Sequence, residues 1–149
     1  MRPAMKPASR RICLVIAVLA LAGIAVSSLA LQNHYAKSAS SYCDLGESFN
    51  CDIVNRSTYS VVLGLPVALI GIIGYAMLLA LSTLYRAKAE TPAMLLIAAL
   101  GGLAFAVYLT YVEAFVLAVW CLLCLSSLVL ILSITLLSSV MVLHSIRNP

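Results

Sequence analysis

Four cysteines are the residues of this chain most able to do chemistry. Cys121 and Cys124 form a C-x-x-C motif in the segment W-C-L-L-C, and Cys43 and Cys51 lie in the polar segment S-Y-C-D-L-G-E-S-F-N-C-D. Paired thiols form and break disulfides through attack by a thiolate, so two neighbouring pairs can exchange electrons with each other. Cys13 stands alone in an apolar run, where a thiol usually packs as a small hydrophobic side chain. The candidate chemistry is therefore dithiol–disulfide exchange.

The C-x-x-C motif lies in an apolar segment. No charged residue occurs between Ala114 and Leu137. Of all 149 residues, 64% are hydrophobic and 9% are charged, which is more apolar than a soluble domain of this size needs. We therefore expect an all-α membrane protein, because helices satisfy their own backbone hydrogen bonds within lipid.

Four segments are long enough to cross a bilayer, which takes about 20 mainly apolar residues. The sequence predicts a bundle of helices over residues 12–31, 61–84, 93–111 and 114–143, with one long redox loop over residues 32–60. Together they form a single domain over residues 1–149. We do not expect the first segment to be a cleaved signal peptide, because its apolar stretch exceeds the ~7–15 residues of a signal's hydrophobic region.

The basic residues predict the orientation of this bundle. Seven of the nine Lys and Arg residues fall on one side of it, and only Lys37 and Arg56 fall on the other. The positive-inside rule places both termini and the 85–91 loop in the cytosol and the 32–60 loop outside it. Glu113 would then mark the membrane boundary before the last helix. The net charge of +4 indicates topology, and we expect no binding to nucleic acid.

Three interpretations of the cysteine pairs compete in the oxidising compartment that this topology gives them. A structural staple suits Cys43 and Cys51 but suits Cys121 and Cys124 poorly, because closing a two-residue gap removes little entropy from the unfolded chain. A four-cysteine metal site is disfavoured, because an oxidising compartment opposes free thiolates and no histidine is near these cysteines in the sequence. The third interpretation is a redox relay.

A redox relay would explain why the C-x-x-C motif lies within the membrane. A thiolate near a helix N-terminus is stabilised by the partial positive charge of that terminus. If the last helix begins near Ala114, then Cys121 lies roughly 10 Å along it at 1.5 Å per residue. A thiol pair within lipid is suited to a lipid-soluble oxidant. We therefore expect a quinone held between the helices.

The ordered set of motifs resembles the vitamin K epoxide reductase family, and in particular its bacterial quinone-linked members. The set comprises the two loop cysteines, a following Ser57, G-L-P-V-A-L-I-G-I-I-G-Y (64–75), Y-L-T-Y-V-E (108–113) and W-C-L-L-C (120–124). The resemblance covers residues from about 10 to 140. It implies a four-helix bundle that encloses a quinone, ubiquinone or menaquinone, near its outer end.

The resemblance also implies a role for each cysteine. Cys124 would lie closest to the quinone and reduce it, and Cys121 would pair with Cys124 and exchange with Cys51. Cys43 and Cys51 would form a shuttle pair, with Cys43 making the mixed disulfide with a thioredoxin-fold partner. The bridge that predominates at rest is left open, either Cys43–Cys51 with Cys121–Cys124 or Cys51–Cys121.

Two further residues, Ser57 and Trp120, each have two possible interpretations. The resemblance places Ser57 near the quinone, whereas its residue type alone fits the N-cap of the second helix. Trp120 fits an aromatic belt at the membrane interface and could also wall the quinone.

The sequence departs from the family in two ways. Some members carry a fused thioredoxin-like domain, whereas this chain ends at Pro149, so we expect a separate periplasmic thiol oxidase as partner of a bacterial inner-membrane protein. The vertebrate enzymes use an asparagine and a tyrosine to bind vitamin K, and the nearest positions here are the apolar Val67 and Leu128. A quinone reductase is thus favoured over an epoxide reductase. A non-catalytic tetraspan protein with stapled loops is the remaining alternative.

Overall fold

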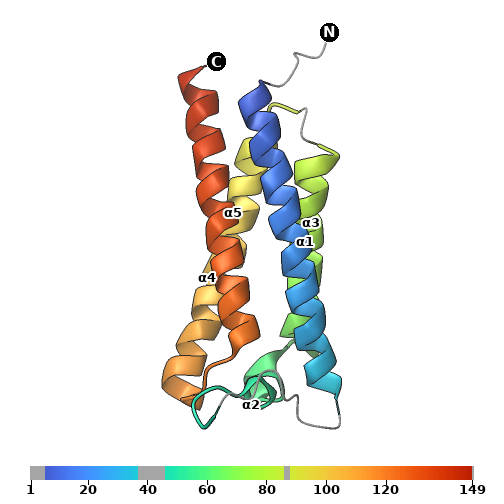
Figure 1. Ribbon diagram of the computed structural model, residues 1–149, viewed down its shortest axis with the longest axis vertical. Coiled ribbons are helices and arrows are strands. Elements are labelled where there is room, and N and C mark those ends of the chain that lie inside the picture. The colour runs from blue at the N-terminus through green and yellow to red at the C-terminus, as the bar shows by residue number, and fades with distance from the viewer. Residues whose placement is uncertain (1–5, 37–45, 86–87, 149) are drawn as a thin grey trace.

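The computed structural model describes residues 6–36, 46–85 and 88–148, and most of them are helical. Four long helices run side by side in an elongated bundle (Figure 1). They are α1 (Pro7–Tyr35), α3 (Val67–Thr83), α4 (Thr91–Val112) and α5 (Leu122–Arg147). The short elements are helix α2 (Cys51–Asn55), the 3-10 turn η1 (Thr58–Ser60), strands β1 (Val61–Val62) and β2 (Leu65–Pro66), and the π-helical turn η2 (Glu113–Leu117).

The predicted all-α membrane class is confirmed. Three helical spans in the described ranges are long and apolar enough to cross a membrane, namely α1, α4 with η2, and α5. Helix α3 is equally apolar but has only 17 residues, fewer than the about 20 of an untilted crossing. Four crossings therefore stay a prediction, although four long helices are present.

The second helix begins six residues later than the predicted start at residue 61. Residues 61–66 form a hairpin in which Val61 pairs with Pro66 and Val62 pairs with Leu65. Leu63 and Gly64 at its tip have φ angles of 54° and 82°, in the left-handed region that a right-handed helix excludes. The predicted boundary is wrong because this turn and Pro66 delay the helix until Val67.

The predicted start of the last helix at residue 114 is also wrong. Helix α4 continues through Val112 and widens into the π-helical turn η2, which ends at Leu117 and is followed by Ala118, whose φ angle is 52°. The chain is then extended until α5 begins at Leu122, so Cys121 is the N-cap of that helix. Cys124 consequently lies in the first turn of α5, and Cys121 does not lie two turns inside a helix.

The helices pack through small residues as well as large apolar ones. Ile16, Leu95 and Ile134, from α1, α4 and α5, are fully buried in one core cluster. On α1, Gly23 lies directly against the ring of Tyr75 from α3, and a β-carbon on Gly71 of α3 would lie 2.8 Å from the Ser27 hydroxyl. Small residues at helix contacts are typical of membrane bundles, where close backbone approach replaces the hydrophobic effect.

The bundle has two different ends. At one end, Lys6 Nζ donates to the carbonyl of Asn148 at 3.5 Å, which brings the start of α1 to the end of α5. Helix α2 and the hairpin lie at the opposite end (Figure 1). The cysteines of α2 and of the α5 N-terminus therefore share the end that is remote from the described chain ends.

Substitution of Gly23 tests the closest helix contact. Gly23→Ala places a methyl group inside the Tyr75 ring, so we expect a loss of about 1–3 kcal/mol in the free energy of unfolding. Thermal unfolding in detergent measures the change. Gly101→Ala is the matched control, because a β-carbon there meets no atom within 4 Å and alanine favours a helix over glycine. Equal stability of Gly23→Ala and the wild type would contradict this packing.

Candidate redox site

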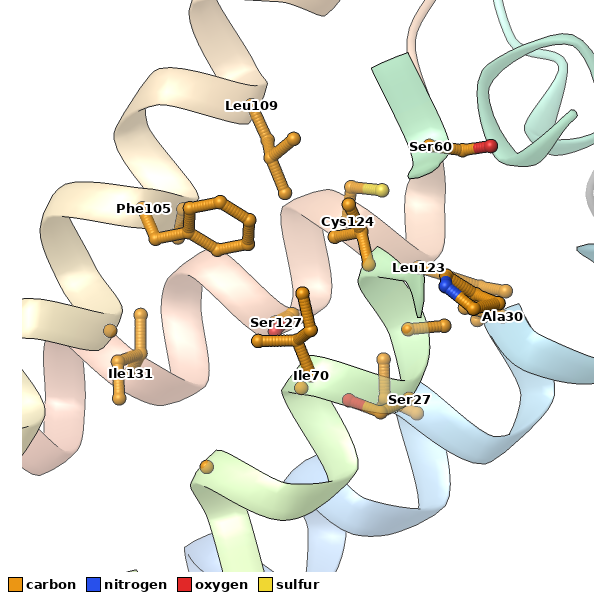
Figure 2. Close-up of a pocket in the computed structure, with 18 of the residues that line it drawn as sticks. Ser27, Ala30, Ser60, Ile70, Phe105, Leu109, Leu123, Cys124, Ser127 and Ile131 are labelled. Carbon is orange, nitrogen blue, oxygen red and sulfur yellow. The ribbon is translucent and has the colours of Figure 1, made fainter. Parts of the chain in front are cut away.

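A cavity of about 480 Å³ lies between the four long helices near the end that carries α2. Its walls are mainly apolar, and in Figure 2 Phe105 and Leu109 of α4 approach Cys124 of α5, while Ile70 of α3 forms part of the same wall. The polar side chains that line it are few: His34, Asn55, Ser57, Tyr59, Ser60, Tyr75, Glu113, Cys124, Ser127 and Ser27. A mainly apolar cavity with a few polar groups is the usual form of a site for a small organic molecule.

The C-x-x-C motif places one thiol at this cavity and the other behind it. Cys124 lines the cavity, whereas Cys121 is fully buried, and both are free thiols. The hydrogen bond from the Cys124 thiol lowers the pKa of Cys121, and the first N–H groups of α5 lower it further against the opposing effect of burial. Asn55 Nδ2 also approaches the Cys121 sulfur, at 3.9 Å.

The loop cysteine Cys51 packs beside the C-x-x-C motif. It is the first residue of α2, is 1% exposed and is disulfide-bonded. Cys51, Val54 and Cys121 form one cluster of buried residues, against which Cys124 also packs. The structure therefore brings three of the four predicted redox cysteines together, and Cys43 lies outside the described residues.

Backbone pairing holds the loop against the start of α5. The Trp120 amide donates to the carbonyl of Ser48 at 2.9 Å, and the Asn50 amide donates to the carbonyl of Trp120 at 3.0 Å. Asn50 also caps α2, since its Oδ1 accepts from the amides of Asp52 and Ile53 at 3.0 and 3.2 Å. The Trp120 side chain is half-buried and is not among the residues that line the cavity. Its backbone aligns the two redox segments.

Ser57 lies at the cavity, as the resemblance implied. Its hydroxyl donates to the carbonyl of Val54 at 2.8 Å, and it makes no capping hydrogen bond to the 3-10 turn that follows. The alternative, an N-cap of the second helix, is wrong because that helix begins ten residues later at Val67. Contact between Ser57 and a quinone stays a prediction.

A polar network joins α2 to the end of α1. His34 Nδ1 donates to the carbonyl of Asn55 at 2.5 Å and lies 3.4 Å from the Ser60 hydroxyl. Arg56 donates to the carbonyls of Asn33 and Ala36 at the last turn of α1. Neither His34 nor Asn55 was predicted to belong to the site, because their contacts arise only when α1 and α2 come together in the fold. The network fixes α2 over the cavity.

Glu113 is a buried acid within the site, a place that the sequence did not predict for it; its position at the membrane boundary stays a prediction. It is 1% exposed, lines the cavity and interacts with the Cys124 side chain. Its Oε2 accepts the amide hydrogen of Cys121 at 3.0 Å. The available signal was a lone acid eight residues before a cysteine in an otherwise apolar run, since ionisable groups within such runs are usually functional.

Comparison with known proteins agrees with these features. A search of curated proteins found no match. The family model of the Vitamin K epoxide reductase family, however, matches residues 14–139. These residues include Cys43, Cys51, Glu113 and the C-x-x-C motif. Members of this family are membrane oxidoreductases linked to thiols and quinones. Because the match extends over most of its length, the chain belongs to the vitamin K epoxide reductase family.

Proposed function

We propose that the protein oxidises protein dithiols and passes their electrons to a quinone in the membrane. The observation that carries this proposal is the position of the C-x-x-C motif between two environments. Cys124 faces an apolar cavity, and Cys121 packs against the disulfide-bonded Cys51 of the loop. A staple would need neither the cavity nor the contact between pairs, so the relay accounts for more of the structure than the tetraspan alternative.

The proposed exchange between the pairs conserves bonds and electrons at each step. A partner dithiol reduces the Cys43–Cys51 bridge, and the Cys51 thiolate attacks Cys121 in a Cys121–Cys124 bridge. This forms a Cys51–Cys121 bridge and releases the Cys124 thiolate. Cys43 then attacks Cys51, which restores the loop bridge and releases Cys121.

The environment of Cys121 favours the last of these steps. A thiol with a low pKa leaves a disulfide faster, and the pKa of Cys121 is lowered by its hydrogen bonds within the first turn of α5. The released Cys124 and Cys121 take up the two protons that Cys51 and Cys43 lost, and the reduced pair then gives two electrons and two protons to the quinone. The products are a quinol and a new Cys121–Cys124 bridge.

The donor in this proposal is a separate thioredoxin-fold oxidase in the periplasm of a bacterium. The protein would reoxidise that oxidase from the inner membrane and so support disulfide formation. This placement is supported by the basic residues at the helix ends remote from α2, of which the described ones are Lys6, Arg10, Arg11, Lys88 and Arg147. It requires four crossings, with α3 as the shortest, and ubiquinone or menaquinone as the acceptor.

Cysteine variants test the order of the relay. With a reduced thioredoxin-fold oxidase as donor, Cys124→Ala and Cys43→Ala should each reduce the rate of quinone consumption in detergent by at least about 100-fold, because each removes a step of the exchange. With dithiothreitol as donor, Cys43→Ala should recover activity and Cys124→Ala should not. Cys13→Ala is the matched control and should retain wild-type activity.

Two outcomes would overturn this order. If wild type consumes no quinone with either donor, the cysteines are staples and the proposed function is wrong. If Cys124→Ala keeps its activity, the quinone receives its electrons elsewhere.

The pKa of Cys121 provides a second test. In a Cys13→Ala, Cys43→Ala, Cys51→Ala protein, we expect the infrared S–H absorption of one thiol to disappear at a lower pH than that of free cysteine, because the pKa of Cys121 is lowered. Adding Cys124→Ala removes the main cause, so the remaining S–H absorption should persist to a higher pH. Identical titration of Cys121 with and without Cys124 would show that the hydrogen bond has no such effect.

A further inference from the structure

We propose that the Glu113 carboxyl carries protons from the C-x-x-C thiols to the quinone in the cavity, a role that rests on the proposed function. Glu113 contacts both cysteines of the motif, since it accepts a hydrogen bond from the backbone amide of Cys121 and interacts with the side chain of Cys124. It also lines the cavity that Cys124 lines. Quinone reduction needs a proton route between these same groups.

The two oxygens of this carboxyl differ, because one accepts a backbone hydrogen bond and the other does not. Oε2 accepts the Cys121 amide hydrogen, whereas the buried Oε1 makes no hydrogen bond of ordinary geometry within the described part of the chain. A buried polar atom without a partner is costly, and such atoms often mark a place that another molecule or a transferred proton occupies. Oε1 is therefore free to exchange a proton.

Among the residues that the structure describes, no basic side chain forms an ion pair with this carboxyl. Among the described residues, the titratable groups that share its cavity or adjoin its cluster are Cys121 and Cys124 of α5, Cys51 of α2, His34 of α1, Tyr59 before the hairpin, and Tyr75 of α3. None of them forms an ion pair with Glu113. A carboxyl without a fixed counter-ion in apolar surroundings changes between its charged and neutral forms more readily than one held in an ion pair.

The proton balance of the reaction gives this group a role. A thiolate is the electron donor, so each thiol must lose a proton as it reacts. The carboxylate of Glu113 accepts the proton from Cys124, and the neutral carboxyl donates it to a quinone oxygen as that oxygen gains negative charge. A second transfer, with the proton of Cys121, completes the quinol and leaves the carboxylate and a Cys121–Cys124 bridge.

Glu113→Gln separates this role from a structural one. The amide has nearly the same shape and can still accept the Cys121 amide hydrogen, but it cannot carry a proton. We expect kcat for quinone reduction to fall about 10²–10⁴-fold while the quinone KM changes less than about threefold. Reduction of the Cys121–Cys124 bridge by a dithiol, measured without quinone, should stay within about threefold of wild type.

Glu113→Ala provides a test that does not depend on the fold of the glutamine variant. Formate should restore quinone reduction to Glu113→Ala, whereas formamide, which accepts hydrogen bonds but carries no proton, should not. Infrared difference spectra of wild type without quinone should show the carbonyl band of a neutral carboxyl that changes when the C-x-x-C pair is reduced. That band should be absent in Glu113→Gln.

These results distinguish failure of the inference from failure of the proposed function. If wild type reduces quinone and Glu113→Gln retains wild-type kcat, or if formamide restores Glu113→Ala as well as formate does, Glu113 is structural and the relay stands. If wild type reduces no quinone but the redox-dependent carboxyl band is present, the proposed function fails and the link between the carboxyl and the thiols stands.

Discussion

The hydrogen bond from the Cys121 amide to the Glu113 carboxylate spans the break between α4 and α5, and the placement of the redox groups depends on it. The chain leaves its helical path at Ala118 and resumes a helix at Leu122. The intervening residues would otherwise leave a buried amide without a partner. Because the bond closes this break, Cys121 stands at the start of a helix and Cys124 faces the cavity one turn later.

The same break lets the loop reach the thiols. Extended backbone at Trp120 pairs with Ser48 and Asn50, which a continuous helix could not do. Cys51 is thereby held in the cluster that contains Cys121, and the network of His34 and Arg56 fixes α2 from the other side. The disulfide-bonded Cys51 and the Cys124 thiol at the cavity are thus brought together around Cys121.

Much of this arrangement could be predicted from the sequence, because it follows from composition and from residue types. The long apolar runs predicted the helices, and the C-x-x-C spacing predicted that Cys121 and Cys124 lie together. The break at residues 118–121 could not be predicted, because its residues are as apolar as their neighbours and its left-handed residue is Ala118, which carries no turn signal. The late start of α3 could have been predicted in part, since Gly64 and Pro66 favour a turn before the helix. The contacts of Glu113 with the two cysteines could not be predicted, because they depend on the break between α4 and α5.

The most direct test of the account is a single turnover of the reduced protein. Protein with Cys121 and Cys124 as thiols is mixed without oxygen with a short-chain quinone in detergent, quenched in acid, and analysed for quinol and for the Cys121–Cys124 bridge. We expect one quinol for each chain, with the bridge and the quinol forming at the same rate. Quinone that stays oxidised, or quinol that forms while both cysteines remain thiols, would contradict it.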